Sequence, residues 1–399
     1  MGGVARPLLN REFVLLCGIS CFAFCNMAVF YGFYGHLEAI GIPPAWRGWL
    51  LGLEPFTAFA LRLFLIPVIS VANAARALLI GLLLLVLALV SYQWALTVPW
   101  LIPLRILHGA AFVLLVSASI TLVVRFIPED RSAQGFSLFS LASLLPYALM
   151  PPLTEWLLPQ VASAAEIYAG VAWLALPAIL LLLQARGRLR AAVADMDATL
   201  TRRPDRQTLR EVRRQSGVPL LLGVSLCIYL GYSAVFYFIK TLASQFGTEG
   251  VGLFFMLSTG AMIATRLLGS LVLDRLPKLL ALRLALAGLA CCVLGLALAD
   301  ASLWLTLLAI PYGITVGIAL PLLSAAIFLT STPALRGVNT NLGLFTMDAG
   351  FFLTPWLGGA LLAAGGTVGQ LLGLCAALLV IALALLAVVR LPAGEGRHD

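Results

Sequence analysis

The sequence predicts an all-α membrane protein of twelve transmembrane helices, arranged as two pseudo-symmetric six-helix bundles. Three observations support this prediction: composition, hydropathy pattern and an internal repeat. Of the 399 residues, 62% are hydrophobic and only 11% are charged, whereas a soluble domain carries about 25% charged residues. The apolar residues form long runs between short polar breaks, and a run of roughly 20 apolar residues spans a bilayer core. The second half of the chain repeats features of the first.

The apolar runs place the individual spans. The first run is too long for a signal peptide and has no small-residue cleavage site after it, so we expect it to be retained. An N-terminal bundle is expected over residues 1–185, a linker over 186–216 and a C-terminal bundle over 217–399. Tryptophans at the span ends, among them Trp94, Trp100 and Trp156, indicate an interfacial aromatic belt. The twelve spans are expected at 12–37, 46–70, 76–96, 100–126, 133–158, 164–185, 217–245, 250–273, 279–299, 303–330, 337–363 and 367–390.

The distribution of charge predicts the orientation. The chain has a net charge of +8, and residues 186–216 alone hold nine arginines against four acidic residues, a net +5. The breaks on the same side of the membrane carry most other basic residues, while the opposite breaks carry only Arg47. By the positive-inside rule, we expect the linker and both termini to be cytoplasmic, and we expect the membrane to be a bacterial inner membrane. The basic linker therefore indicates contact with lipid head groups and not with nucleic acid.

The internal repeat points to a transporter. The motif AVFY occurs at residues 28–31 and again at 234–237, a lag of 206 residues. Arg62 matches Arg266, and Gly109 matches Gly313, both at a lag of 204. Two parallel repeats joined by a basic cytoplasmic loop form a transporter architecture, in which the substrate binds between the halves near the midplane.

Several motifs resemble the major facilitator superfamily. The segment RLLGSLVLDRLPK, residues 266–278, is similar to the superfamily signature after span eight, with Asp274 and Arg275 in its acidic and basic places. The first-half copy, residues 62–76, has Ser70 in place of the acid. In LRILHGAAF, Arg105 precedes Gly109 by four residues, as in the span-four motif.

The stretch over residues 332–359 resembles span eleven of bacterial efflux-type members, although the glycines of the antiporter motif in span five are missing. The resemblance implies the major facilitator fold. It also implies an association of Arg105 with proton coupling, and a cavity lined by spans one and seven. From these spans we select Asn26, Tyr31, Phe236 and Tyr237 as candidate cavity residues. For each of them, ordinary helix packing is the alternative.

Ionisable residues inside the bilayer are candidates for function, because each costs about 2.5–3.5 kcal/mol even on lenient insertion scales. From their depths we expect Glu54 to pair with Arg105, and Lys240 to pair with Asp348 in at least one conformation. The alternative is that these pairs only neutralise one another, or that Lys240 extends to the surface. The embedded set is Glu54, Arg62, Arg105, His108, Lys240, Arg266 and Asp348.

A second group is expected to act in gating or structure near the cytoplasmic side. Arg62 and Arg266 occupy matched positions in the two halves, and Asp274 is expected near Arg275 or Arg336. His108 is either a titrating group or a structural hydrogen-bonding residue. Cys17, Cys21 and Cys25 share a helix face, but no His or acidic residue matches that spacing, so we expect packing and no metal site.

These features predict a secondary active transporter that exports a small organic solute by alternating access, with a proton gradient as its energy source and no cofactor. We expect it to act as a monomer among membrane lipids. The alternative is an importer or facilitator of a small organic anion, with Arg105 and Lys240 as ligands. From a different class, an intramembrane enzyme or lipid scramblase stays open, although neither a phosphate-binding loop nor a nucleophile–base pair is present in the sequence.

Overall fold

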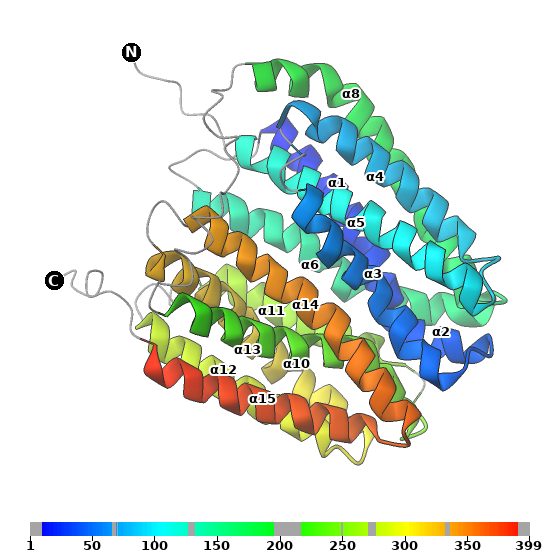
Figure 1. Cartoon of the computed structure of the whole chain (residues 1–399), viewed down its shortest axis with the longest axis vertical. Coiled ribbons are helices and arrows are strands. Elements are labelled where there is room, and N and C mark those ends of the chain that lie inside the picture. Colours follow the sequence, from blue (N-terminus) through cyan, green and yellow to red (C-terminus); the bar gives the residue numbers. More distant parts are fainter. Residues whose placement is uncertain are drawn as a thin grey trace. The chain divides into compact units, whose positions relative to one another are not determined.

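The computed structural model describes residues 10–65, 69, 71–126, 132–194, 217–248, 250–269, 277–331 and 336–389, and the regular structure in these ranges is entirely helical. Figure 1 shows the helices in chain order. They are α1 (Arg11–Val29), η1 (Phe30–Gly32), α2 (Phe33–Ala39), α3 (Pro44–Leu65), α4 (Val71–Ser91), α5 (Val98–Phe126), α6 (Ser132–Leu157), η3 (Leu158–Gln160), α7 (Ala164–Ala172), α8 (Ala175–Ala194), α10 (Val218–Ser244), α11 (Gly252–Gly269), α12 (Lys278–Ala297), α13 (Ser302–Thr330), α14 (Arg336–Ala363) and α15 (Val368–Val388).

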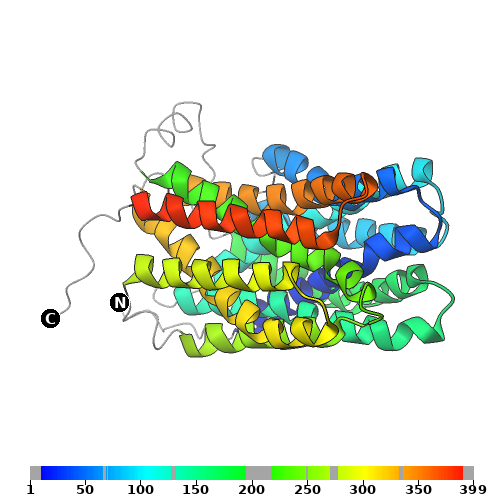
Figure 2. The ribbon, with the colours of Figure 1, turned by 90° about the horizontal axis from the view of Figure 1, so that it is seen from below.

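The helices confirm the all-α fold and agree with the expected spans. The first span is built from α1, η1 and α2, and the sixth from α7 and α8, which meet at a turn over Trp173 and Leu174. With these joined, the described helices make twelve spans. Eight helical segments of the described chain are long and apolar enough to cross a membrane by length and composition. In the view from below, the helices of each unit run along a common direction (Figure 2).

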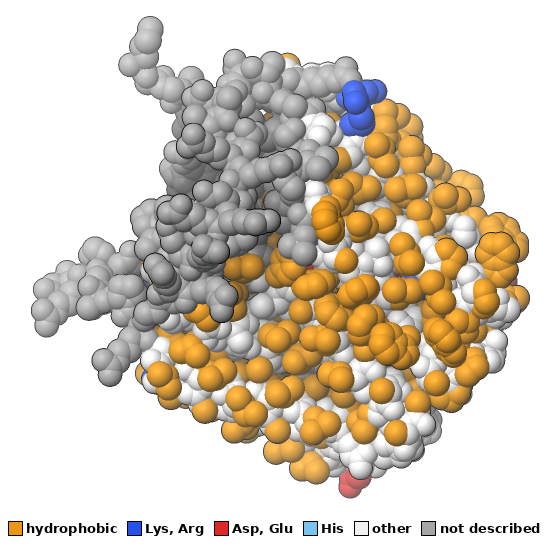
Figure 3. Space-filling model, in the orientation of Figure 1, with side chains coloured by type: hydrophobic (Ala, Val, Ile, Leu, Met, Phe, Trp, Pro, Cys, Tyr) orange, Lys and Arg blue, Asp and Glu red, His pale blue; other side chains and the backbone are white. Residues whose placement is uncertain are grey.

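The surface of the described residues is that of a membrane protein. In Figure 3, hydrophobic side chains are spread over the whole of the described face, and charged side chains appear mainly at its margins. The tryptophans of the expected aromatic belt are exposed, because the side chains of Trp94 and Trp100 are each 69% accessible and that of Trp156 is 65% accessible. Indole rings favour the interface between lipid head groups and hydrocarbon.

The chain divides into two compact units. Unit 1 holds residues 1–31 and 53–202, and unit 2 holds residues 32–52 and 203–399. The segment 32–52 thus belongs by its packing to the unit that contains the second half of the chain. The division into bundles expected at the 186–216 linker stays a prediction, and the linker residues 195–216 lie outside the described residues.

The sequence repeat corresponds to a repeated packing contact inside each unit. In unit 1, a Cβ on Gly109 of α5 would overlap the backbone oxygen of Glu54 in α3. In unit 2, a Cβ on Gly313 of α13 would overlap the backbone oxygen of Ser258 in α11. Only glycine permits such an approach. Because Ser258 follows Glu54 by the same 204 residues, the lag read from the sequence describes equivalent helix crossings.

Candidate functional site

The candidate site is a buried ion pair inside unit 1. Arg105 Nη2 of α5 lies 3.5 Å from Glu54 Oε2 of α3, and the two side chains are only 2% and 3% exposed. The close approach of Gly109 to α3 explains this placement, because Arg105 and Gly109 are one turn apart on α5 and the glycine brings the two helix backbones together. The structure thus brings together the pair expected from depth.

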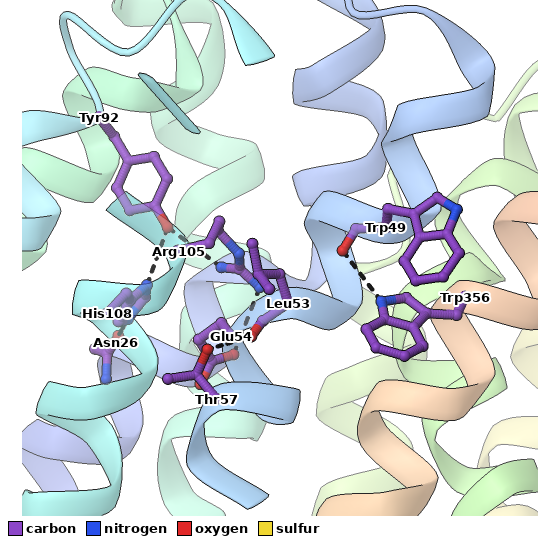
Figure 4. Close-up of polar contacts among 9 residues, drawn as sticks. All are labelled: Asn26, Trp49, Leu53, Glu54, Thr57, Tyr92, Arg105, His108 and Trp356. Atoms are coloured by element: carbon purple, nitrogen blue, oxygen red, sulfur yellow. Dashed lines mark hydrogen bonds and ion pairs between the residues drawn. The ribbon is translucent and has the colours of Figure 1, made fainter. Parts of the chain in front are cut away.

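A chain of hydrogen bonds continues from Arg105 across the interior of unit 1. Arg105 Nη1 donates to the Tyr92 hydroxyl at 3.3 Å, and that hydroxyl lies 3.1 Å from His108 Nδ1. His108 Nε2 bonds to Asn26 Oδ1, and Asn26 Nδ2 donates to the backbone oxygen of Ala23 at 3.0 Å. Figure 4 shows the side chains converging from α1, α3, α5 and the residue that follows α4. Together with the Glu54–Arg105 ion pair, this hydrogen-bond chain therefore links four transmembrane segments.

A neutral His108 satisfies all of these bonds. Arg105 and the Asn26 amide nitrogen are donors only, so they fix the two ends of the hydrogen-bond chain. With the proton of His108 on Nε2, the imidazole donates to Asn26 and accepts the Tyr92 hydroxyl proton at Nδ1. Each of these bonds then has one donor and one acceptor. A protonated imidazole would add a second buried positive charge beside Arg105 and would require the Tyr92 hydroxyl to find another acceptor.

The guanidinium of Arg105 is also held by an aromatic face. Its Cζ lies 5.6 Å from the ring centroid of Phe30, and the Phe30 ring stacks on Tyr168 with centroids 4.3 Å apart. Cation–π contacts of this kind are stronger where water is excluded. The site is thus a fixed positive charge beside one buried carboxylate.

The four candidate cavity residues are all buried. Asn26 belongs to the hydrogen-bond chain, and Tyr31 donates to Glu155 Oε1 of α6 at 3.3 Å. Phe236 and Tyr237 of α10 both contact Phe351 of α14, with ring centroids 6.1 and 6.0 Å apart. In this structure the two aromatic residues pack within unit 2, which agrees with the packing alternative.

Lys240 and Asp348 are not brought together. Helices α10 and α14 run side by side, with Ser225 bonded to Thr346 at 2.6 Å and Ser233 bonded to Thr354 at 2.8 Å. This register places Asp348 level with position 227, which is 13 residues, or about 20 Å, from Lys240 along α10. The expected depth of Asp348 was counted from a nominal bilayer thickness, whereas α14, with 28 residues, is longer than the bilayer core requires. Their pairing in another conformation stays a prediction.

The surroundings of Lys240 and Asp348 therefore differ. Lys240 lies over Gly32, where a Cβ would be 3.6 Å from its Nζ. Asp348 is 4% exposed and interacts electrostatically with Tyr229 of α10, which also interacts with Arg266. Asp348 thus lies in a polar cluster inside unit 2 that the sequence did not predict.

The residues assigned to gating are described only in part. Arg62 is buried at the end of α3, and Arg266 of α11 interacts electrostatically with Tyr229 and Tyr232. Asp274 and Arg275 lie outside the described residues, as does the side chain of Arg336. No group of three or more His, Cys, Asp or Glu side chains in the described part of the chain is arranged to hold a metal ion.

Sequence reasoning missed Tyr92 and Glu155. Tyr92 is fully buried and joins Arg105 to His108, yet it lies just after the end of α4, where a tyrosine is ordinarily interpreted as part of the interfacial belt. Glu155 lies near the end of α6, where an acidic residue ordinarily indicates the boundary of a span. A groove of about 590 Å³ lined by Gln93, Trp94, Ser163, Glu166, Ala169, Gly170 and Trp173 contains none of the predicted site residues.

Several solved structures share the fold. A point mutant of the nucleoside transporter NupG is 13% identical with a TM-score of 0.76, over 95% of this chain and 100% of that one. The inward-open xylose transporter XylE from E. coli is 15% identical with a TM-score of 0.73, over 98% of each chain. A POT family transporter in complex with a thioalcohol-conjugated peptide is 13% identical with a TM-score of 0.68, over 95% and 96%.

A search of curated proteins finds no match. At these identities the solved structures establish the fold alone. The family is established by the sequence itself, because the model of the Major Facilitator Superfamily matches residues 16–355, well over half of the chain. With its twelve helical spans and apolar surface, the chain is a multi-pass membrane transporter and not an enzyme, and it belongs to the Major Facilitator Superfamily.

Proposed function

We propose that the protein is a proton-coupled secondary transporter that exports a small organic solute, and that Glu54 is its coupling acid. The observation that carries this proposal is the buried Glu54–Arg105 pair, held at 3.5 Å in the interior of unit 1. A buried carboxylate keeps its charge while a guanidinium is close, and it favours the proton when the two separate. A motion that changes this distance therefore exchanges protons.

The pair has the properties that such coupling needs. Arg105 is held by Tyr92 and by the face of Phe30, so it is the fixed partner. Glu54 meets Arg105 at a distance longer than a normal hydrogen bond, and Pro55 follows it in α3. Because proline removes a helical hydrogen bond, α3 bends more easily here than elsewhere. The acid is therefore placed on the part of the site that is best able to move.

The direct test uses the full chain in liposomes that contain a pH-sensitive dye. A panel of small organic cations, anions and neutral compounds is added under an imposed proton gradient, and dye response and solute content are both measured. We expect at least one solute to move against proton flow. With Glu54→Gln, solute exchange without a gradient should remain, while solute-driven proton movement is lost.

Glu166→Gln is the matched control, because Glu166 is an exposed carboxylate on α7 outside the ion pair. It should behave like the native chain. Proton movement that persists in Glu54→Gln would remove this residue from the mechanism. Uptake of an anion in the direction of the proton gradient, lost on replacing Arg105, would instead support the import alternative.

A further inference from the structure

The groove of about 590 Å³ in unit 1 shares no residue with the ion pair or with the hydrogen-bond chain. It lies between α7 and the turn that follows α4, and these two helices pack against each other. One wall comes from α7 and the residues at its two ends, at positions three or four apart that share one helix face: Ser163, Glu166, Gly170 and Trp173. Gln93 and Trp94 form the opposite wall. We call it the α4–α7 groove.

The two tryptophans of the groove face outward, and packed aromatic rings lie behind them. Tyr92 and Tyr168, which come from the same two segments, are buried, and their ring centroids lie 5.8 Å apart. Trp94 and Trp173 are by contrast 69% and 71% accessible. Exposed indoles of a membrane protein lie at the level of the lipid head groups. We therefore expect the groove to open at that level of the bilayer.

The polar side chains of the groove have one negative charge and no counter-ion. Glu166 is the one charged residue among those that line the groove, and none of them is basic. Within the described part of the chain, the side chains of Gln93, Ser163 and Glu166 form neither a hydrogen bond nor an ion pair. A carboxylate between two indoles matches an ammonium group, which pairs with the carboxylate and is attracted to the indole faces.

The equivalent place in unit 2 lacks these features. Helices α7 and α15 begin 204 residues apart, and they pack against α4 and α12, respectively. Thr367 accepts a bond from the backbone nitrogen of Gln370 at 3.2 Å, and the Gln370 side chain accepts one from the backbone of Thr367 at 3.0 Å, so both side chains stabilise the helix itself. Leucine stands 204 residues after Gly170, and alanine 204 residues after Trp173. The helix therefore does not need the residues that form the groove in unit 1.

We propose that the α4–α7 groove binds the head group of phosphatidylethanolamine, a phospholipid that carries a primary amine. The ammonium group forms an ion pair with Glu166 and lies against the indoles of Trp94 and Trp173. Ser163 and Gln93 supply hydrogen-bond donors for the phosphate. A lipid with a phosphate and no amine, such as phosphatidylglycerol, brings a negative charge beside Glu166 with no basic residue to offset it. The inference goes beyond the proposed transport and does not rest on it.

The test uses the purified full chain in detergent, stripped of lipid and measured by native mass spectrometry. Phosphatidylethanolamine and phosphatidylglycerol with identical acyl chains are added in equal amounts, and the ratio of the two bound lipids is recorded. Because the acyl chains are the same, non-specific binding to the apolar surface contributes equally to both lipids. We expect the native chain to bind more phosphatidylethanolamine than phosphatidylglycerol.

Glu166→Gln removes the negative charge and keeps the size of the side chain. The ratio should fall about twofold to fivefold, the loss expected for an ion pair that is open to water. Asp300→Asn is the matched control, because Asp300 is an exposed carboxylate in the turn between α12 and α13 of unit 2. It should leave the ratio unchanged. A native chain with no preference, or a Glu166→Gln chain with the native ratio, would overturn the proposal.

A second variant fills the groove without changing its charge. A Cβ on Gly170 would meet nothing within 4 Å, so Gly170→Leu should fold normally and occupy part of the groove. Its ratio should fall toward that of Glu166→Gln. Gly373→Leu in α15, where an added Cβ also meets nothing within 4 Å, should keep the native ratio. The native ratio in Gly170→Leu would show that the lipid binds elsewhere.

A soluble competitor distinguishes a lipid from a free solute. Glycerophosphoethanolamine has the same head group and no acyl chains. At the concentration of the lipid it should not displace phosphatidylethanolamine, because contact of the acyl chains with apolar surface contributes to lipid binding. Displacement at equal concentration would overturn the assignment to a lipid. Because no solute flux is measured, failure of the proposed proton coupling does not affect this result.

Discussion

The interiors of the two units share one helix crossing and differ in its chemistry. Gly109 meets Glu54 in unit 1, and Gly313 meets Ser258 in unit 2, in each case through a backbone oxygen. One turn before the glycine stands Arg105 in the first case and Ala309 in the second. The backbone contact is repeated, while the ion pair has no equivalent at the second crossing, because serine and alanine carry no charge.

The difference teaches that the charges are not required for the fold. If an ion pair were needed to hold the two helices together, unit 2 would need one at the same crossing. Unit 2 instead uses serine and threonine elsewhere, as in the bonds from Ser225 to Thr346 and from Ser233 to Thr354. Burying Glu54 and Arg105 costs free energy, and the helix crossing does not need the pair. We therefore propose that the pair is kept for proton coupling.

The largest effect is expected from breaking the ion pair. Arg105→Ala leaves the Glu54 carboxylate without its guanidinium in a dry interior, so unfolding should become easier by about 3–5 kcal/mol. Thermal unfolding in detergent measures this change. The double variant Glu54→Gln with Arg105→Ala removes both charges and should recover much of the loss. A double variant no more stable than Arg105→Ala would contradict the view that the pair is dispensable for folding.

The two glycine contacts should show similar, somewhat smaller effects. Gly109→Ala and Gly313→Ala each place a Cβ against a backbone oxygen that it would overlap, and overpacking of this kind costs about 1–3 kcal/mol. The matched change Gly373→Ala in α15, where a Cβ meets nothing within 4 Å, should be neutral. If Gly109→Ala and Gly313→Ala lower the free energy of unfolding by clearly different amounts in the same assay, the two helix crossings are not equivalent.

Removal of the Tyr92 hydroxyl tests the hydrogen-bond chain alone. Tyr92→Phe deprives Arg105 Nη1 of an acceptor and His108 Nδ1 of a donor, while the ring stays in place. An unsatisfied buried polar group costs about 1–3 kcal/mol. We also expect a change in the pH profile of transport. If Tyr92→Phe changes neither the free energy of unfolding nor the pH profile of transport, the hydrogen bonds beyond Arg105 are not part of the site.

The smallest effect is expected in unit 2. Ser233→Ala removes a hydroxyl that bridges α10 to the Gly350 oxygen at 3.0 Å, and hydrogen bonds between transmembrane helices average about 0.6 kcal/mol. The melting temperature should barely change, and the pH profile of transport should not change. A larger effect than that of Tyr92→Phe would reverse the contrast between the two units.

The spans and the Glu54–Arg105 pair could be predicted because hydropathy and depth along a helix depend on local sequence alone. Every expected span overlaps a described helix, and both members of the pair lie at similar depth on spans two and four. In this structure Lys240 and Asp348 are separated along α10, because the bonds of Ser225 and Ser233 mark a register between α10 and α14 that a depth counted from a nominal membrane thickness does not contain. That register depends on tertiary contacts, which no single segment encodes.

Tyr92 and the close contacts of Gly48 and Gly52 in α3 with α14 could not be predicted for a related reason. A tyrosine near the end of a span has the same local pattern whether it faces head groups or closes a buried hydrogen-bond chain, and only the packing of α4 against α5 decides. Likewise, Gly48, Gly52 and Gly359 are three of 36 glycines. Nothing in the sequence around them distinguishes a docking contact from a flexible position.

The length of two equivalent helices has a consequence for the membrane itself. Helices α5 and α13 each contain 29 residues, or about 44 Å at 1.5 Å per residue, against a hydrocarbon core of about 30 Å. They must tilt, protrude or thicken the bilayer around them, at a cost that grows with each ångström of mismatch. The acyl-chain length of the surrounding phospholipids therefore determines how strongly the bilayer forces these two helices to tilt or protrude. One of them carries Arg105 and the other its counterpart Ala309.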